Sequence, residues 1–194
     1  MTEDLKVGRQ NSPDTEKAVL GAMMLSNEAV TDVVSKLSTD AFFDPRNRII
    51  FDAIRGLNDK SIPVDMISVV ECLRQSGKLI EAGNASYVTE LTNLSGFGLA
   101  RTDHYCKLLV QMQIERQLVV MATEIIRMSD ETNDVSDTIS FADRQLQKIN
   151  EIISLNSRME HISSAVEKAA DESILRTENR RQGKMSGVTS GLKD

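Results

Sequence analysis

The sequence has few cysteines, no long apolar runs and no excess of positive charge, and these absences narrow the class of protein. Cys72 and Cys106 are the only cysteines and form no CxxC pair, and the N-terminus lacks the apolar stretch of a signal peptide. The longest apolar runs reach about five residues, as in LVVMA at 118–122, whereas a membrane span needs about 20. We therefore expect a protein of the reducing cytoplasm that does not cross a membrane.

Positive charge is too sparse for a general attraction to nucleic acid. Lys and Arg number 23 against 29 Asp and Glu, which gives a net charge of −6, so any contact with DNA would have to be local. One basic cluster exists near the C-terminus, and it has no interleaved aromatics on which bases could stack. It is a candidate for weak DNA contact, although a solvated linker is the favoured interpretation. The cluster consists of Arg176, Arg180, Arg181 and Lys184.

Helix-start signals recur through the first half of the chain. Of the 194 residues, 40% are hydrophobic, which is enough for a real core. A cap residue followed by proline occurs at Ser12-Pro13 and again at Asp44-Pro45, and Asn27 restarts a helix between them. Apolar residues follow each start at helical spacing. The pattern predicts three helices here, preceded by a flexible arm.

Two further helices complete the predicted core. Pro63-Val-Asp65 opens a fourth helix that ends near Gly77, a residue suited to a left-handed C-cap, with a strand as the less favoured alternative. Asn84 or Ser86 caps a fifth helix, after which SGFG at 95–98 interrupts the chain. These elements predict an all-α fold that begins with a compact helical bundle.

The next segment predicts a long αα-hairpin. No Gly or Pro interrupts the helical pattern from Arg101 to Met128, a rod of about 42 Å. A polar stretch, SDETNDVS, then leads to a second helix from Ser136 to Leu155. Leu118 to Ala122 are apolar at five successive positions, so one antiparallel partner cannot cover all of them.

We therefore expect the hairpin to pack on the core near its base and to self-associate further along. The candidate self-association surface consists of Leu118, Val119, Met121, Ile125, Ile149, Ile152 and Ile153.

A capping box, Ser164-x-x-Glu167, begins a separate short helix beyond the hairpin. An isolated helix of this length is marginal in water, so we expect it to dock on another surface. The candidate docking face consists of Val166, Ala170 and Ile174.

No motif supports catalysis or the binding of a cofactor or metal. Ser76-Gly77-Lys78-Leu79 lacks the first glycine and the hydroxyl of a P-loop, and Gly96-Phe-Gly98 lacks the third glycine of a dinucleotide fingerprint. His104 and Cys106, two positions apart on one helix, point to different sides. His161 stands alone. We name no catalytic, cofactor-binding or metal-binding residue.

Several segments taken together resemble the N-terminal region of bacterial replicative DNA helicases, the DnaB family. The resemblance covers most of residues 13–155, and the helix after Ser164 resembles the linker helix of that family. The resembling segments are PDTEKAVLGAMML (13–25), DAFFDPRNRIIFDAI (40–54), PVDMISVVECLRQSGKL (63–79), AGNASYVTEL (82–91) and HYCKLLV (104–110). The closing GVTSGL (187–192) is similar to the start of the RecA-like motor domain of the family.

This resemblance implies a hexameric, ATP- and magnesium-dependent helicase of the bacterial cytoplasm that encircles single-stranded DNA at the fork. The chain would be its non-catalytic assembly domain in the primosome, paired through the hairpins as a dimer or a trimer of dimers, and would contact primase and a helicase loader. The alternative is a free-standing helical adaptor that is complete at residue 194. The expected division is 1–12 flexible arm, 13–98 core, 99–156 hairpin, 157–185 connector and linker helix, and 186–194 start of the motor domain.

Overall fold

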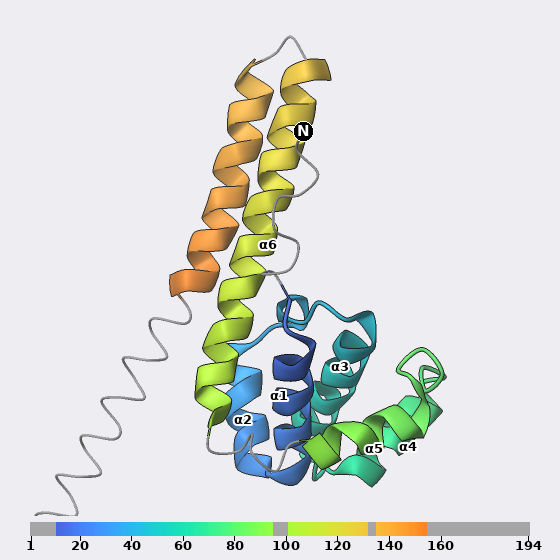
Figure 1. Cartoon of the computed structure of the whole chain (residues 1–194). Coiled ribbons are helices and arrows are strands. Elements are labelled where there is room, and N and C mark those ends of the chain that lie inside the picture. Colours follow the sequence, from blue (N-terminus) through green and yellow to red (C-terminus); the bar gives the residue numbers. More distant parts are fainter. Residues whose placement is uncertain (1–10, 95–100, 132–134, 155–194) are drawn as a thin grey trace, which may run out of the picture. The chain divides into compact units, whose positions relative to one another are not determined.

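The computed structural model describes residues 11–94, 101–131 and 135–154, and every element within these ranges is helical (Figure 1). The predicted all-α fold is therefore confirmed. The elements are α1 (Pro13–Leu25), α2 (Asn27–Lys36), the short 3-10 helix η2 (Thr39–Ala41), α3 (Pro45–Asp59), α4 (Met66–Gln75), α5 (Asn84–Leu94), α6 (Thr102–Glu131) and a further helix over residues 135–154. None of the described helices is long and apolar enough to span a membrane.

Helix α1 is the centre of the core and packs against α2, α3, α5 and α6. Its apolar residues are therefore buried around most of its circumference, and Val19, Leu20 and Met23 have no exposed surface. Phe42 and Phe51 close the core beside η2 and α3, with ring centroids 4.9 Å apart. The predicted small helical core is confirmed in these elements.

The helix starts follow the local signals in the sequence. Pro13 and Pro45 each occupy the first turn of a helix, where a missing N–H costs nothing. The Asp44 carboxylate accepts from the Arg46 amide at the start of α3. Asp65 and Ser68 form a reciprocal capping box at the start of α4. Caps of this kind fix the boundaries before any tertiary contact is considered.

Two glycines between α4 and α5 permit the turn that reverses the chain. Gly77 and Gly83 have φ of +71° and +89°, a region that disfavours side chains. A Cβ on Gly83 would stand 3.0 Å from the Cβ of Tyr87. Asn84, one of the two predicted caps, is the first residue of α5 and also has a positive φ, of 65°.

Helix α6 is about 45 Å long, and only its first half packs against the core, through α1, α2 and η2. Cys106 and Leu109 are buried there. Figure 1 shows the second half of α6 extending past the core, with the helix of residues 135–154 running back alongside it. The predicted hairpin is confirmed, and α6 continues three residues beyond the predicted end at Met128.

The chain divides into two units, one of residues 1–152 and one of residues 153–194. All packing described here belongs to the first unit. Of the second unit, only Ile153 and Ser154 are described. The predicted linker helix with Val166, Ala170 and Ile174, and the basic cluster from Arg176 to Lys184, lie outside the described residues.

Candidate functional site

The part of the hairpin beyond the core carries a set of exposed apolar side chains. Large apolar residues with 40% to 70% of their surface exposed occur on both helices. We call six of them the hairpin face: Leu118, Val119, Ile126, Val135, Ile139 and Leu146. Scattered exposed apolar residues are ordinary, but a contiguous set on a protruding element is typical of a protein-interaction surface.

The helical spacing brings the exposed residues of the two helices to the same side of the hairpin. On each helix, a less exposed residue faces the other helix, and an exposed residue stands three positions before it. Around the helix axis, the directions of these two side chains differ by about 60°. Because the two helices run antiparallel, this rotation turns the exposed side chains of both helices toward the same side of the hairpin. These pairs of positions are 118 and 121, 122 and 125, 139 and 142, and 146 and 149.

This side of α6 is opposite to the core. Gln113 is buried against the core and donates to the Ser38 hydroxyl at 3.2 Å. Leu118 and Ala122 stand nine positions after the buried Leu109 and Gln113, which is two and a half turns of a helix. The hairpin face is therefore open to a second macromolecule, with the core on the far side.

The structure divides the sequence-predicted surface residues into three groups. Leu118, Val119 and Ile153 are exposed, with 40%, 48% and 45% of their surface accessible. Met121, Ile125 and Ile152 are half-buried, and Ile149 is buried at 5%. Ile149 is already covered within the chain, because it turns toward α6.

Sequence reasoning missed five exposed apolar residues on the hairpin. They are Val120, Ile126, Val135, Ile139 and Leu146. A signal for some of them was present, because Ile139, Leu146 and Ile153 repeat at seven-residue intervals. The choice between neighbouring isoleucines depended on which ones face the other helix, which only the packing decides.

Polar contacts fix the start of α6 to α2. The Lys36 ammonium donates to Asp103 at 2.8 Å and also pairs with Asp32 at 2.6 Å. The bond from Lys36 lowers the pKa of the Asp103 carboxyl, against a smaller opposing effect of burial. For Lys36, burial acts to lower the pKa, but the two aspartates outweigh it and the pKa is raised. Asp32 and Asp103 line an open polar pocket with Ser26, Glu28, Ala29, Thr31, Ser35 and Thr102.

A second set of contacts fixes α6 where it leaves the core. The Arg116 guanidinium donates to the carbonyls of Asp40 and Ala41 at 2.9 and 2.8 Å. Desolvation at this position lowers the pKa of Arg116. Arg48 of α3 donates from Nε to the Phe42 carbonyl at 2.7 Å. Two arginines from different helices thus hold the backbone of the segment that we call the 39–44 loop (residues 39–44).

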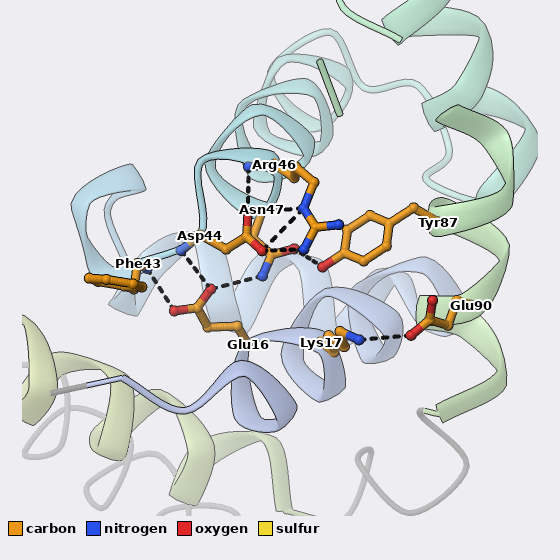
Figure 2. Close-up of polar contacts among 8 residues, drawn as sticks. All are labelled: Glu16, Lys17, Phe43, Asp44, Arg46, Asn47, Tyr87 and Glu90. Carbon is orange, nitrogen blue, oxygen red and sulfur yellow. Dashed lines mark hydrogen bonds and ion pairs between the residues drawn. The ribbon is translucent and has the colours of Figure 1, made fainter. Parts of the chain in front are cut away.

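The Glu16 carboxylate holds the other side of the 39–44 loop (Figure 2). It is 1% exposed and accepts from the amides of Phe43 and Asp44 at 2.6 and 3.2 Å. The Asn47 side chain donates to the same carboxylate at 2.8 Å and accepts from the Tyr87 hydroxyl at 2.9 Å. Glu16 therefore occupies the start of α3, where the helix dipole favours a negative charge.

Charged side chains cover the outer side of this network. Arg46 lies 4.2 Å from the Tyr87 ring centroid and pairs with Asp44 at 2.6 Å, and this pairing holds the pKa of Asp44 below its usual range. Lys17 pairs with Glu90 at 2.7 Å, as Figure 2 shows. These cations already have carboxylate partners, so we assign the network to holding α1, α3 and α5 together.

The structure describes the surroundings of the Cys106 thiol and of most side chains that could bind a metal ion. Burial raises the pKa of the Cys106 thiol to about 12, so it stays protonated at neutral pH. In the described ranges, no group of three or more His, Cys, Asp or Glu side chains is arranged to hold a metal ion.

Comparisons with known proteins agree on one family. A sequence model of the DnaB-like helicase N terminal domain matches residues 9–111. The replicative DNA helicase DnaB of Leifsonia xyli is 30% identical over 178 residues, which are 91% of this chain and 38% of that protein. The chain spans 19% of the DnaB helicase of Rhodothermus marinus, to which it is 27% identical. These relatives are thus much longer than the chain.

Solved structures share the fold. The crystal structure of the N-terminal domain of DnaB helicase from Mycobacterium tuberculosis matches with a TM-score of 0.67 and 25% identity, covering 71% of this chain and 98% of that one. A DnaB-like replicative helicase, described with its interactions with primase, matches with a TM-score of 0.58 and 23% identity, covering 79% of this chain and 35% of that one. By its sequence over residues 9–111 and by its fold, the chain belongs to the family of DnaB-like helicase N-terminal domains.

Proposed function

We propose that the chain is the assembly and partner-docking region of a hexameric replicative DNA helicase that unwinds duplex DNA with ATP. The observation that carries this proposal is the family match over residues 9–111 together with the shared fold. The relatives are named replicative DNA helicases, and the chain spans only a minor part of their length. The activity of the whole protein is therefore part of the proposal.

In this proposal the chain contributes assembly and performs no catalysis. Its 194 residues contain no Gly-x4-Gly-Lys-Ser/Thr sequence for binding nucleotide phosphates. ATP, magnesium and single-stranded DNA would be bound by other parts of the helicase. ATP turnover by the purified chain would contradict this division of roles.

Self-association would occur through the hairpin face. A second copy that packs on this face would remove its six apolar side chains from water without meeting the core, which lies on the opposite side of α6. A pair formed by the same face on both copies is closed by a two-fold axis. Residues 13–98 then act as the core and residues 99–156 as the pairing element.

The proposed protein partners are primase and a helicase loader. One structural neighbour is described with primase, and that contact is known for that protein. In this chain the exposed surface of the core and hairpin would be available to such partners. The segment with Val166, Ala170 and Ile174 would serve as a linker helix that docks on a neighbouring subunit.

Sedimentation velocity over a range of concentrations tests the pairing. We expect Ile139→Asp and Leu118→Asp each to weaken self-association of the chain by at least about tenfold, because each places a charge in an apolar contact. Ile67→Asp is the matched control, since Ile67 is 73% exposed on α4, away from the hairpin. Monomeric behaviour of the unchanged chain at every concentration, or an equal effect of the control, would refute pairing through this face.

A further inference from the structure

The 39–44 loop presents an exposed aromatic residue on a rigid backbone. Glu16, Arg48 and Arg116, from three different helices, hold the loop through five hydrogen bonds to its backbone. Phe43 nevertheless remains 45% exposed. A side chain that is already fixed loses little conformational entropy when another group covers it, so Phe43 has the properties of a binding anchor.

Two arginines lie near this ring. The Arg116 guanidinium is 5.8 Å from the Phe43 ring centroid. Arg48 donates from Nε to the loop backbone, and no carboxylate within the described residues pairs with it. Desolvation lowers the pKa of Arg116, and the charge of Arg48 adds to this lowering, while Glu16 and Asp40 act against it. The two guanidinium groups therefore repel each other, and a carboxylate beside them would relieve this repulsion.

An exposed valine of α6 extends the apolar part of this surface. Val120 stands one turn beyond Arg116 and two turns beyond Gln113, so it follows the core-facing line of α6 past the edge of the core. Val120 is 68% exposed there. The surface shares no residue with the hairpin face, and it fits a segment that presents apolar and acidic side chains on one side. We call it the corner patch, which consists of Phe43, Arg48, Arg116 and Val120.

The sequence that precedes α1 has this pattern. Residues 1–10 lie outside the described ranges, but their sequence alternates, with Glu3, Leu5 and Val7 at every second position and Asp4 and Lys6 between them. Side chains at every second position of an extended segment point to one side. Such a segment would present one acidic and two apolar side chains together and would turn Asp4 and Lys6 away.

This segment is tethered close to the corner patch. Glu16, in the first turn of α1, accepts from the Phe43 amide at 2.6 Å (Figure 2). Asn11, where the described chain begins, stands only five positions before Glu16, and Glu3 stands eight positions before Asn11. Eight extended residues span up to about 26 Å, so the segment can reach the patch of its own chain. A short tether gives a local concentration of about millimolar, at which even a weak contact is populated.

We propose that residues 3–7 bind the corner patch of their own chain as an extended segment. Leu5 and Val7 cover the apolar part of the patch, and Glu3 pairs with Arg48. The contact requires no second copy, so it does not depend on the proposed helicase function. An outside partner of the same acidic and apolar chemistry then binds the corner patch only by displacing this segment.

A fluorescent reporter in the patch tests the contact. The chain has no tryptophan, so Phe43→Trp gives a single reporter whose quenching by acrylamide measures its exposure. Removing residues 2–7 should raise the quenching constant by about threefold, because the segment no longer covers the ring. The protection should not depend on protein concentration. Equal quenching with and without residues 2–7 would overturn the proposal, and protection that appears only at high concentration would assign the patch to a second copy instead.

Charge reversal in the reporter chain tests which side of the segment binds. Glu3→Lys and Arg48→Glu should each remove most of the protection, and the double variant should recover it. Asp4→Lys, on the other side of the segment, and Arg55→Glu, exposed on α3, are matched controls that should leave quenching unchanged.

The variant at position 3 keeps the test independent of the fold. If circular dichroism shows that Arg48→Glu does not fold, Glu3→Lys alone retains the test, because position 3 precedes α1. Equal effects of Asp4→Lys and Glu3→Lys, or a folded double variant no better protected than the single variants, would contradict the proposed pairing.

Discussion

At the scale of single residues, the Glu16 carboxylate connects more of the structure than its position on α1 suggests. It accepts from two backbone amides and one side-chain amide, and it is almost fully buried. A buried carboxylate is tolerated only where such donors replace water. Glu16 therefore joins α1 to α3 and fixes the 39–44 loop at the same time.

Glu16→Gln tests this role. The neutral amide would lose the charge-assisted bonds and would turn an N–H donor toward backbone donors, so we expect the free energy of unfolding to fall by about 1.5–3 kcal/mol. Urea denaturation measures the change. The exposed Glu28 on α2 provides the control, and Glu28→Gln should have almost no effect. Equal midpoints for the two variants would contradict the proposed role of Glu16.

The pairing of Lys36 with Asp103 predicts a pH dependence of stability. The pKa of Asp103 in the folded chain lies below its ordinary 3.8, so its contribution is complete above that value and is lost as the pH falls through the lowered one. The raised pKa of Lys36 places the corresponding alkaline loss above 10.5.

Asp103→Asn should therefore lower the free energy of unfolding at pH 7 by about 0.5–1 kcal/mol, a small effect because the carboxylate is partly exposed and screened. The difference from the unchanged chain should shrink as the pH falls through the lowered pKa of Asp103. Urea unfolding across a pH series measures it, with Asp143→Asn as the control. A difference that is constant with pH would rule out the ion pair as its source.

At the scale of elements, the glycines of the core separate into two kinds. Gly56 lies inside α3, and a Cβ built on it meets nothing within 4 Å. Gly77 follows α4 with φ of +71°, where a Cβ is disfavoured. The first glycine lowers helix stability without a compensating contact, whereas the second makes the turn possible.

Gly56→Ala should raise the free energy of unfolding by about 0.5–1 kcal/mol. Gly77→Ala should lower it by about 1–2 kcal/mol. Thermal unfolding followed by circular dichroism compares the two variants with the unchanged chain. Two shifts of the same sign would show that backbone conformation is not what distinguishes these positions.

At the scale of the whole molecule, the sequence predicted what local rules determine. The starts of α1, α3 and α4 follow from proline and cap residues, and the hairpin follows from a helical pattern without Gly or Pro. The contacts that hold the 39–44 loop could not be predicted, because Glu16, Arg48 and Arg116 are far apart in sequence and meet only when α1 packs against α3 and α6. The candidate self-association surface included the buried Ile149 and left out the exposed Ile139, because only the packing between the two hairpin helices decides which isoleucine is covered.

The seven-residue spacing of Ile139, Leu146 and Ile153 has a geometric consequence for pairing. A heptad stripe coils with a pitch of about 150 Å, so a 20-residue arm of about 30 Å completes only a fifth of a superhelical turn. Such a short stripe is nearly straight, and sliding one copy by a heptad brings equivalent isoleucine and leucine side chains back into contact. The apolar stripe therefore leaves the register of the pair undetermined, and groups at the ends of the hairpin must select it.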